Sequence, residues 1–552
     1  MSELKKSNIS IKVLGIYLVI FSLYFLSYPL HYSFIENQDS IYYAALFNYL
    51  QNFLLGIISG VDYGQFFYPD SLPALNGEPS FGIFSIWLVL KLIISDNVYT
   101  FYTLTVTIFT LNSLAVFSFI RYLNKKASPL VALIAGLVFS FNMFMLANID
   151  NINTVFFAPG IASIYVFLGI ILEQKSQKRP LLIFSFLLAF QLFCSIYNFI
   201  YVVVFISLFL FLNYKRSVAF IKFINKKYLL SFIPLIVICC CYLYLIVFLP
   251  NKPDHWNFNV DLASIKTLSF ELKNFTSAIP FSIHGPERKA LLLDVKSFFS
   301  SYVFIIVILL GLKSFWKSHK VLLIIVLACF LIGVGPYISL NEKEILMPLG
   351  YLFNALDTYS YFRMPYRIYL LILLILILIF SYGLSWMEGS FRKSYLILPV
   401  IGILIIFENI PLQRHYIYFS IYQKEGEELA TLLDQAQVNN VLFLPAGDLI
   451  NRNGDPTIMN RTIYIFMYWQ SYIHKNVING NSAFNPPHTR ELNEALYNST
   501  QPYQSLVMYC KKYKIDCVVQ YVDPKWAFDD FNFDQQEIEN VLQQNGVAYY
   551  LR

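Results

Sequence analysis

Several stretches of this chain are too long and too apolar for a water-soluble protein. The segments Leu370–Gly383 (LLILLILILIFSYG) and Phe232–Phe248 contain no charged residue. A helix needs about 20 apolar residues to cross a bilayer core. Because lipid offers the backbone no hydrogen-bond partners, only helices and closed barrels, which satisfy these groups internally, span a membrane. Charged residues make up 13% of the sequence, against about 25% in soluble domains. The sequence therefore predicts a mainly α, polytopic transmembrane helical bundle.

The apolar runs predict about eleven spans joined by loops of alternating charge. The predicted spans are residues 11–33, 98–120, 128–147, 154–173, 180–195, 198–213, 229–250, 298–313, 320–341, 367–387 and 395–412. Every second loop is basic, as at Arg121, Lys125 and Lys126, and basic loops remain cytoplasmic. This topology places the N-terminus in the cytoplasm and the C-terminal region outside. It also accounts for the net charge of +6 without a nucleic-acid partner.

One apolar run does not fit this alternation. Counting Phe81–Ser95 as a span would turn every later basic loop to the outside, against the charge rule. The run is also only about fifteen residues long, shorter than a span requires. We expect a juxtamembrane or re-entrant helix near the outer surface.

Ordinary charge density returns after about residue 413, which divides the chain into residues 1–413 and 414–552. The second part is predicted to be a small α/β domain because helix-like and strand-like patterns alternate in it. The predicted helices are Gly426–Ala436, Glu491–Tyr497 and Pro502–Lys512, and the predicted strands are Asn440–Pro445, Asp516–Tyr521 and Val547–Leu551. Cys510 and Cys517 lie here, and a disulfide between them is one possibility.

The loop after the first span, residues 34–97, is acidic, aromatic and too long for a simple connector. Asp39 lies just beyond the apolar end of that span, where a carboxylate can take a proton from an acceptor hydroxyl. Alternatively, Asp39 only caps a helix that begins near Ser40. Glu78 is a second carboxylate for the same chemistry, or an exposed acid of the loop.

Two further outer positions carry polar side chains near the membrane. Arg363 and Arg367 stand where the tenth span begins, and guanidinium groups suit a phosphate or pyrophosphate. The alternative for both is snorkelling to lipid headgroups. Asp150 and Asn151 lie between the third and fourth spans. They either line a cavity shared with Asp39 and Glu78 or form a polar turn. No histidine pair has metal-ligand spacing, and a divalent metal is left open.

Several different short motifs follow one another along the chain. They are Gln38-Asp39-Ser40, Phe67-Tyr68-Pro69, Gly77-Glu78-Pro79, the Ala147–Thr154 turn, Cys194-Ser195-Ile196-Tyr197-Asn198, Phe362-Arg363-Met364-Pro365-Tyr366-Arg367, and in the C-terminal part Phe443-Leu444-Pro445, Tyr468-Trp469-Gln470, Asn479-Gly480 and Phe484-Asn485-Pro486-Pro487. Together they resemble the GT-C-type integral membrane glycosyltransferases, in particular a bacterial branch of them.

The resemblance implies a transferase that uses a polyprenyl-phosphate-linked sugar and a glycan, lipid or protein acceptor of the cell envelope. It implies that Asp39 acts as the base or orients the acceptor, and that Tyr68 and Tyr197 line the cavity. The family often has a histidine in the turn after the third span. This chain has Asn151 there, so we do not assign a role in proton transfer to this turn.

Two other classes of function are consistent with the sequence. A transporter or flippase of a lipid-linked substrate would often show an internal repeat, and we find none between the two halves. A non-catalytic envelope assembly protein would use the C-terminal region to bind partners. The aromatic residues that favour this reading are equally typical of lipid-facing and interfacial packing.

Overall fold

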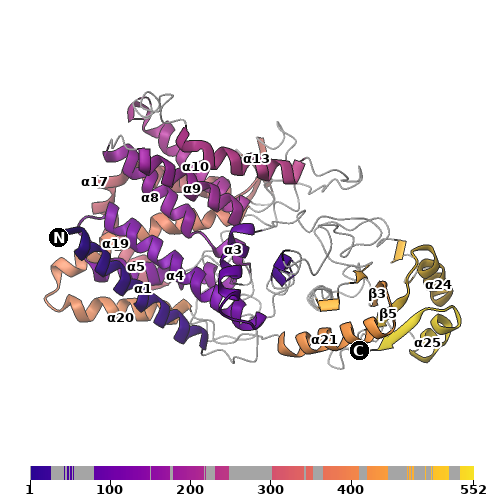
Figure 1. Cartoon of the computed structure of the whole chain (residues 1–552). Helices are drawn as coiled ribbons and strands as arrows, with labels where there is room; N and C mark the ends of the chain where they lie inside the picture. The colour runs from indigo at the N-terminus through magenta and orange to yellow at the C-terminus, as the bar shows by residue number, and fades with distance from the viewer. Residues whose placement is uncertain are drawn as a thin grey trace.

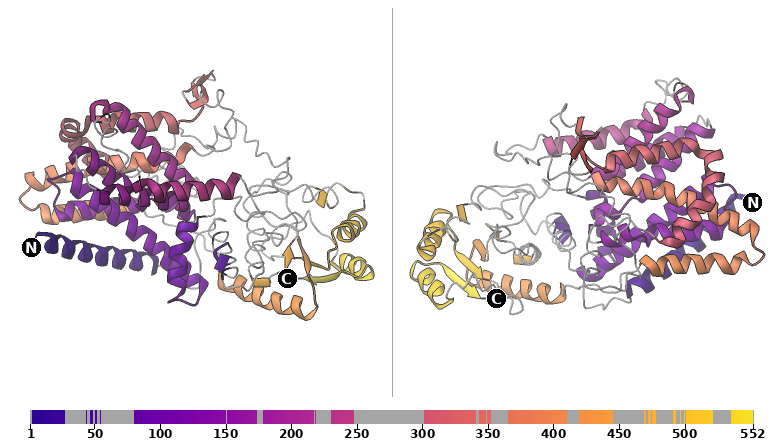
Figure 2. Two further views of the ribbon diagram at one scale, coloured as in Figure 1. Left: turned by 45° about the horizontal axis from the view of Figure 1, so that its top comes forward. Right: turned by 180° about the vertical axis from the view of Figure 1, so that it is seen from behind.

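The computed structural model describes most of the apolar part of the chain and much of its C-terminal part. The described residues are 2–26, 80–149, 151–173, 178–216, 230–247, 301–340, 343–347, 349–351, 365–409, 419–444, 501–520 and 535–551, with some single or short positions between these ranges. A helical bundle contains the N-terminus, and a small sheet lies at the other side of the molecule, next to the C-terminus (Figures 1 and 2).

Helices form most of the described structure. In the bundle they are α1 (Ser2–Leu26), α3 (Phe81–Lys91), α4 (Asn97–Leu123), α5 (Pro129–Ser140), α6 (Met143–Ala147), α7 (Ile152–Val155), α8 (Ala158–Glu173), α9 (Lys178–Cys194), α10 (Ile196–Leu212), η3 (Leu230–Phe232), α13 (Ile233–Val247), α17 (Tyr302–Gly333), η5 (Pro365–Ile368), α19 (Tyr369–Ser390) and α20 (Ser394–Asn409).

Within the described residues, four helical stretches are long and apolar enough to cross a membrane: Tyr99–Leu123, Ile152–Glu173, Tyr302–Gly333 and Pro365–Ser390. Six shorter apolar helices accompany them: Ser10–Phe25, Phe81–Lys91, Pro129–Ser140, Arg179–Cys194, Ile196–Leu212 and Ser394–Asn409. The prediction of a helical, membrane-type bundle is confirmed at this level. The helix of 11 residues at Phe81–Lys91 is too short to cross a bilayer.

One of the predicted spans is interrupted, and two others are joined. The predicted span 128–147 is divided into α5, which ends at Ser140 with Phe141 as its C-cap, and α6, which Asn142 caps, its Oδ1 accepting from the Phe144 N–H at 2.9 Å. The predicted spans 298–313 and 320–341 form one helical run, α17, with a non-helical residue at His319 (φ −141°, ψ 38°). The break therefore lies in the segment predicted to join the two spans.

The predicted span 320–341 extends too far. Helix α17 ends at Gly333, and Tyr337–Leu340 (β1) instead pairs antiparallel with Lys343–Leu346 (β2). Gly335 adopts a positive φ of 84° and Pro336 follows it. A left-handed glycine and then a proline are typical terminators of a helix, so the chain turns here.

Close helix contacts hold the bundle together. A side chain at Gly311 of α17 or Gly383 of α19 would collide with the backbone of the opposite helix, so these glycines let the two helices approach closely. On α1, Tyr17 donates from Oη to the Leu133 carbonyl of α5 at 3.0 Å. Near the other end of α1, Phe25 lies against Tyr102 of α4, at 6.1 Å between ring centroids.

The C-terminal part contains a four-stranded parallel sheet in the order β4 (Asn476–Val477), β3 (Asn440–Leu444), β5 (Cys517–Gln520) and β6 (Ala548–Leu551). Its helices are α21 (Phe419–Gln435), α24 (Pro502–Lys512) and α25 (Gln535–Gln544). Figure 1 shows α24 and α25 beside the strands and α21 extending toward the bundle.

Side chains alternate across this sheet. In β3, Val441 and Phe443 pack with α21 and Trp469, whereas Leu442 and Leu444 pack with residues of α24 and α25 such as Leu506 and Leu542. Both faces are therefore covered, as parallel sheets require. The predicted strands in β3, β5 and β6 and the helix at Pro502–Lys512 are found, and α21 begins before the predicted Gly426. Glu491–Tyr497 lies mostly outside the described residues.

The thiols of the C-terminal part are not paired. Cys510 and Cys517 are both free and buried, so the disulfide that the sequence allowed is not formed. Burial raises the pKa of each thiol to about 12. They serve as small core residues on the two sides of the sheet.

Candidate functional site

The helices are interrupted at one end of the bundle and are joined by basic turns at the other. At one end the chain is broken three times: between α6 and α8, at the junction of α9 and α10, and at η5. We call this the broken-helix end. The opposite end holds the turns near residues 121–129, 213–216, 316–320 and 391–394, and we call it the basic end because Arg and Lys are frequent there.

Buried amide side chains stabilise the break around α7 (Ile152–Val155). Asn112 of α4 donates from Nδ2 to the Val155 carbonyl at 2.8 Å, and its Oδ1 accepts from the Phe157 N–H at 3.0 Å. Gln191 of α9 accepts from the Gly160 N–H at 2.8 Å. Because lipid cannot satisfy such groups, non-helical backbone at membrane depth requires protein partners.

Asn198 completes this arrangement from α10. Its Nδ2 lies 3.0 Å from the carbonyl oxygens of Asn153 and Thr154 and 3.3 Å from that of Phe156. Ser195 begins α10 as its N-cap, with its side chain accepting from the Asn198 N–H. The short α9–α10 junction therefore holds the α7 segment in place.

Arg367 and Tyr197 meet at this end. The guanidinium carbon Cζ of Arg367 lies 4.7 Å from the centroid of the Tyr197 ring. Arg367 is 3% exposed and Tyr197 9%, whereas an arginine that reaches to lipid headgroups keeps its charged tip outside. A cation on an aromatic face away from water gains up to about 2 kcal/mol, so this contact fixes a positive charge inside the protein.

Neighbouring rings position the segment that carries Arg367. The ring of Tyr366, also in η5, lies 6.2 Å from that of Phe144 in α6, and Tyr369 at the start of α19 lies 5.3 Å from the same ring. All three side chains are buried. Helix α6 thus supports the turn from which Arg367 projects.

Three of the predicted site residues lie in the described part of the chain. Tyr197 and Arg367 are in contact, and Asn151 precedes α7, which is bonded to Asn198 next to Tyr197. The Oδ1 of Asn151 accepts from the Thr154 hydroxyl at 3.0 Å, which agrees with the polar-turn interpretation. The other predicted site residues lie outside the described residues: Asp39, Tyr68, Glu78, Asp150 and Arg363.

The buried amides were not predicted as site residues. Asn112, Gln191 and Asn198 each stand within or at the start of an apolar run, and a lone amide in such a run commonly bonds another helix. That signal was present in the sequence. Among the described residues, no group of three or more His, Cys, Asp or Glu side chains is arranged to hold a metal ion.

A comparison with protein-family models gives no match, and neither does a comparison with curated proteins. What the protein does therefore has to be inferred from its own residues and their arrangement.

Proposed function

We propose that this protein is a GT-C-type membrane glycosyltransferase. It transfers a sugar from a polyprenyl-phosphate-linked donor to a cell-envelope acceptor on the outer face of the bacterial cytoplasmic membrane. The observation that supports this most is the guanidinium of Arg367, buried against Tyr197 where η5 enters a membrane-length helix. A fixed cation at that depth suits the phosphate of a donor whose prenyl tail stays in the bilayer.

The proposed roles follow from charge. Arg367, together with Arg363, stabilises the phosphate that departs from the sugar. Asp39 accepts the proton of the acceptor hydroxyl as this oxygen bonds to the anomeric carbon, and Glu78 is the second carboxylate. Tyr197 holds the guanidinium of Arg367 in place. Tyr68 and Asp150 are proposed to line the acceptor cavity, and Asn151 forms the polar turn that precedes α7. A divalent metal remains compatible with this scheme.

The topology belongs to the proposal. About eleven spans place the N-terminus in the cytoplasm and residues 414–552 outside as an α/β domain. Two observations support it. Asn97, at the start of α4, donates to the Tyr472 hydroxyl at 3.0 Å, so the C-terminal part touches the broken-helix end. Arg121, Lys125 and Lys126 follow at the far end of the same helix.

The test is a transfer assay with the purified protein in nanodiscs and a panel of polyprenyl-phosphate sugars. Wild type is compared with Asp39→Asn, which keeps the size of the side chain and removes its basicity. We expect donor turnover with an added envelope acceptor fraction, and loss of turnover in the variant. Equal turnover in both proteins would exclude Asp39 as the base.

The same preparation tests the flippase alternative. Proteoliposomes are loaded with the lipid-linked sugar on one side, and both its position and its covalent structure are measured. Movement across the bilayer without any change in covalent structure would overturn the transferase proposal.

A further inference from the structure

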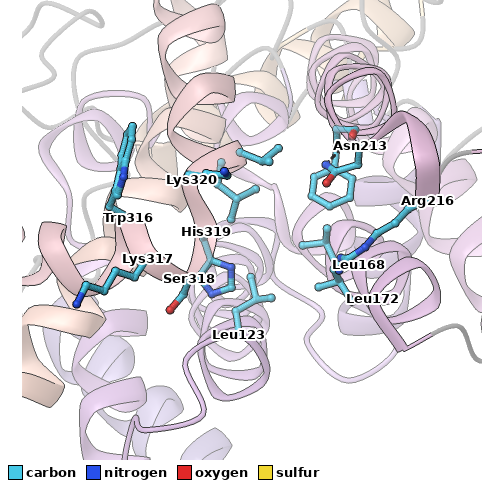
Figure 3. Close-up of a pocket in the computed structure, with 13 residues that line it drawn as sticks. Leu123, Leu168, Leu172, Asn213, Arg216, Trp316, Lys317, Ser318, His319 and Lys320 are labelled. Carbon is cyan, nitrogen blue, oxygen red and sulfur yellow. Dashed lines mark hydrogen bonds between the residues drawn. The ribbon is translucent and has the colours of Figure 1, made fainter.

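We propose that the basic end contains a binding site for the phosphate headgroup of a lipid from the leaflet that this end faces. A cavity of about 610 Å³ lies there, between α17 on one side and the end of α10 with α8 on the other. Figure 3 shows Lys320 and His319 on one wall and Arg216 on the facing wall, with Lys317 directed away. This site lies at the opposite end from Arg367 and does not depend on sugar transfer.

The break in α17 creates the first wall. Because His319 is not helical, the helix is interrupted between Lys317 and Lys320, and both remain exposed. The imidazole is fixed from behind, since its Nε2 lies 3.0 Å from the Tyr382 hydroxyl of α19. Trp316, 56% exposed, stands at the same level, and exposed tryptophan is typical of the membrane interface.

The second wall is the end of α10. Asn213 caps this helix, with both its backbone N–H and its Nδ2 donating to the Phe209 carbonyl at 3.0 and 2.9 Å. The turn continues with a bond from the Arg216 N–H to the Asn213 carbonyl at 2.9 Å. This short, defined turn directs Arg216 back toward the cavity instead of along the helix axis.

The lining combines positive charge with an apolar floor. Arg216, Lys317 and Lys320 are cations, and no carboxylate is among the described residues that line the cavity. The nearest acid in sequence, Glu173, is bonded to the Tyr122 hydroxyl. Leu168, Leu172 and Phe209 form the floor.

An anionic lipid fits this combination better than a free ion. A bare phosphate would leave most of the cavity and its leucine and phenylalanine surface unused. A lipid places its phosphate between Arg216 and Lys320 and its first methylene groups on the floor. Basic pockets between membrane helices commonly bind lipid headgroups in this way.

The test is lipid retention by the full-length protein, measured by native mass spectrometry after exchange from nanodiscs. Separate arms contain neutral phosphatidylcholine alone, added phosphatidylglycerol, an added polyprenyl phosphate, and inorganic phosphate. The variant Arg216→Gln/Lys320→Gln removes two cations from the walls. The control Lys125→Gln/Lys126→Gln removes two exposed cations of the same end that do not line the cavity.

We expect one or both phosphate lipids to be retained by wild type and by the control. The double wall variant should bind them about 100-fold more weakly, because each of its two cations loses a hydrogen bond to the phosphate that contributes about 1.5 kcal/mol. The arm with the stronger retention identifies the source of the headgroup. Equal loss in the control and the wall variant would overturn the proposal, because the binding would then be a surface-charge effect.

A second variant addresses shape independently of charge. Asn213→Trp fills the space beside Arg216 while all cations remain, and its folding is checked by size-exclusion chromatography. Folded Asn213→Trp should lose lipid retention as well. Unchanged retention in that variant, or displacement of the lipid by equimolar inorganic phosphate, would contradict a headgroup site in this cavity.

Discussion

Polar groups are buried and hydrogen-bonded at one end of the bundle and exposed at the other. At the broken-helix end, polar groups are buried and bonded: Asn112, Gln191 and Asn198 bond backbone groups in and after α7, and Arg367 lies on Tyr197. At the basic end, Lys125, Lys126 and Arg392 are exposed. A buried charge must be stabilised by specific contacts. An exposed charge in a loop can determine the orientation of the chain in the membrane without such contacts. The polar groups of the two ends are therefore stabilised in different ways, by specific contacts at one end and by exposure at the other.

Donor binding should show the largest difference between the ends. Arg367→Gln is expected to weaken binding of a polyprenyl-phosphate sugar about 10–150-fold, because a hydrogen bond to a charged group contributes about 1.5–3 kcal/mol. Arg367→Lys should restore only part of it, because a point charge replaces a planar fork. Both are measured by scintillation proximity in nanodiscs. Binding as tight in Arg367→Gln as in wild type would remove Arg367 from the site.

Stability should depend on the buried amides of the broken-helix end. Asn198→Leu leaves the carbonyls of Asn153 and Thr154 without their donor, and we expect a loss of about 2 kcal/mol. Asn409→Leu, the control, removes a single bond to the Ile405 carbonyl at 2.7 Å, for about 1 kcal/mol. Thermal unfolding in detergent compares the two. A smaller effect for Asn198→Leu than for the control would show that the α7 region does not need this donor.

The contact between the C-terminal part and the bundle should contribute less to stability than the buried amides do. Tyr472→Phe removes the hydroxyl that accepts from Asn97 at 3.0 Å, and we expect it to cost about 1 kcal/mol or less. Hydrogen exchange near the start of α4 should rise slightly. Full protection there in Tyr472→Phe would show that this hydrogen bond does not join the two parts.

The buried thiols of the C-terminal part make the stability of the protein depend on pH. Burial raises the pKa of Cys510 and Cys517 from 9.0 to about 12. The folded form therefore holds its protons more tightly than the unfolded form, so stability is complete below pH 9 and falls as the pH rises from 9 toward 12.

Thiol labelling gives the measurement. At pH 8 both native thiols should resist maleimide until the protein unfolds, since the thiolate is the reactive form. Met508→Cys, at an exposed position of α24, should label at once and serves as the control. Rapid labelling of Cys510 in the folded protein would contradict its burial.

The mainly helical character of the apolar part was predicted because an uncharged apolar run admits few other structures in lipid. It did not predict the β1–β2 hairpin, because the apolar run continues past Gly333 and only Gly335 and Pro336 mark the turn. Helix α25 was also missed, since its polar sequence of 10 residues shows only a narrow apolar stripe. Arg367 was predicted as a site residue, but its contact with Tyr197 depends on helices far apart in the chain.

We propose that the buried charge of the broken-helix end serves sugar transfer and that the exposed charges of the basic end do not. The direct measurement is transfer of a radiolabelled sugar from a polyprenyl-phosphate donor to envelope acceptors in proteoliposomes, for wild type, Arg367→Gln and Arg392→Gln. We predict that Arg367→Gln abolishes transfer and that Arg392→Gln, in the exposed turn between α19 and α20, retains it. Equal activity in all three proteins, or equal loss in both variants, would contradict the account.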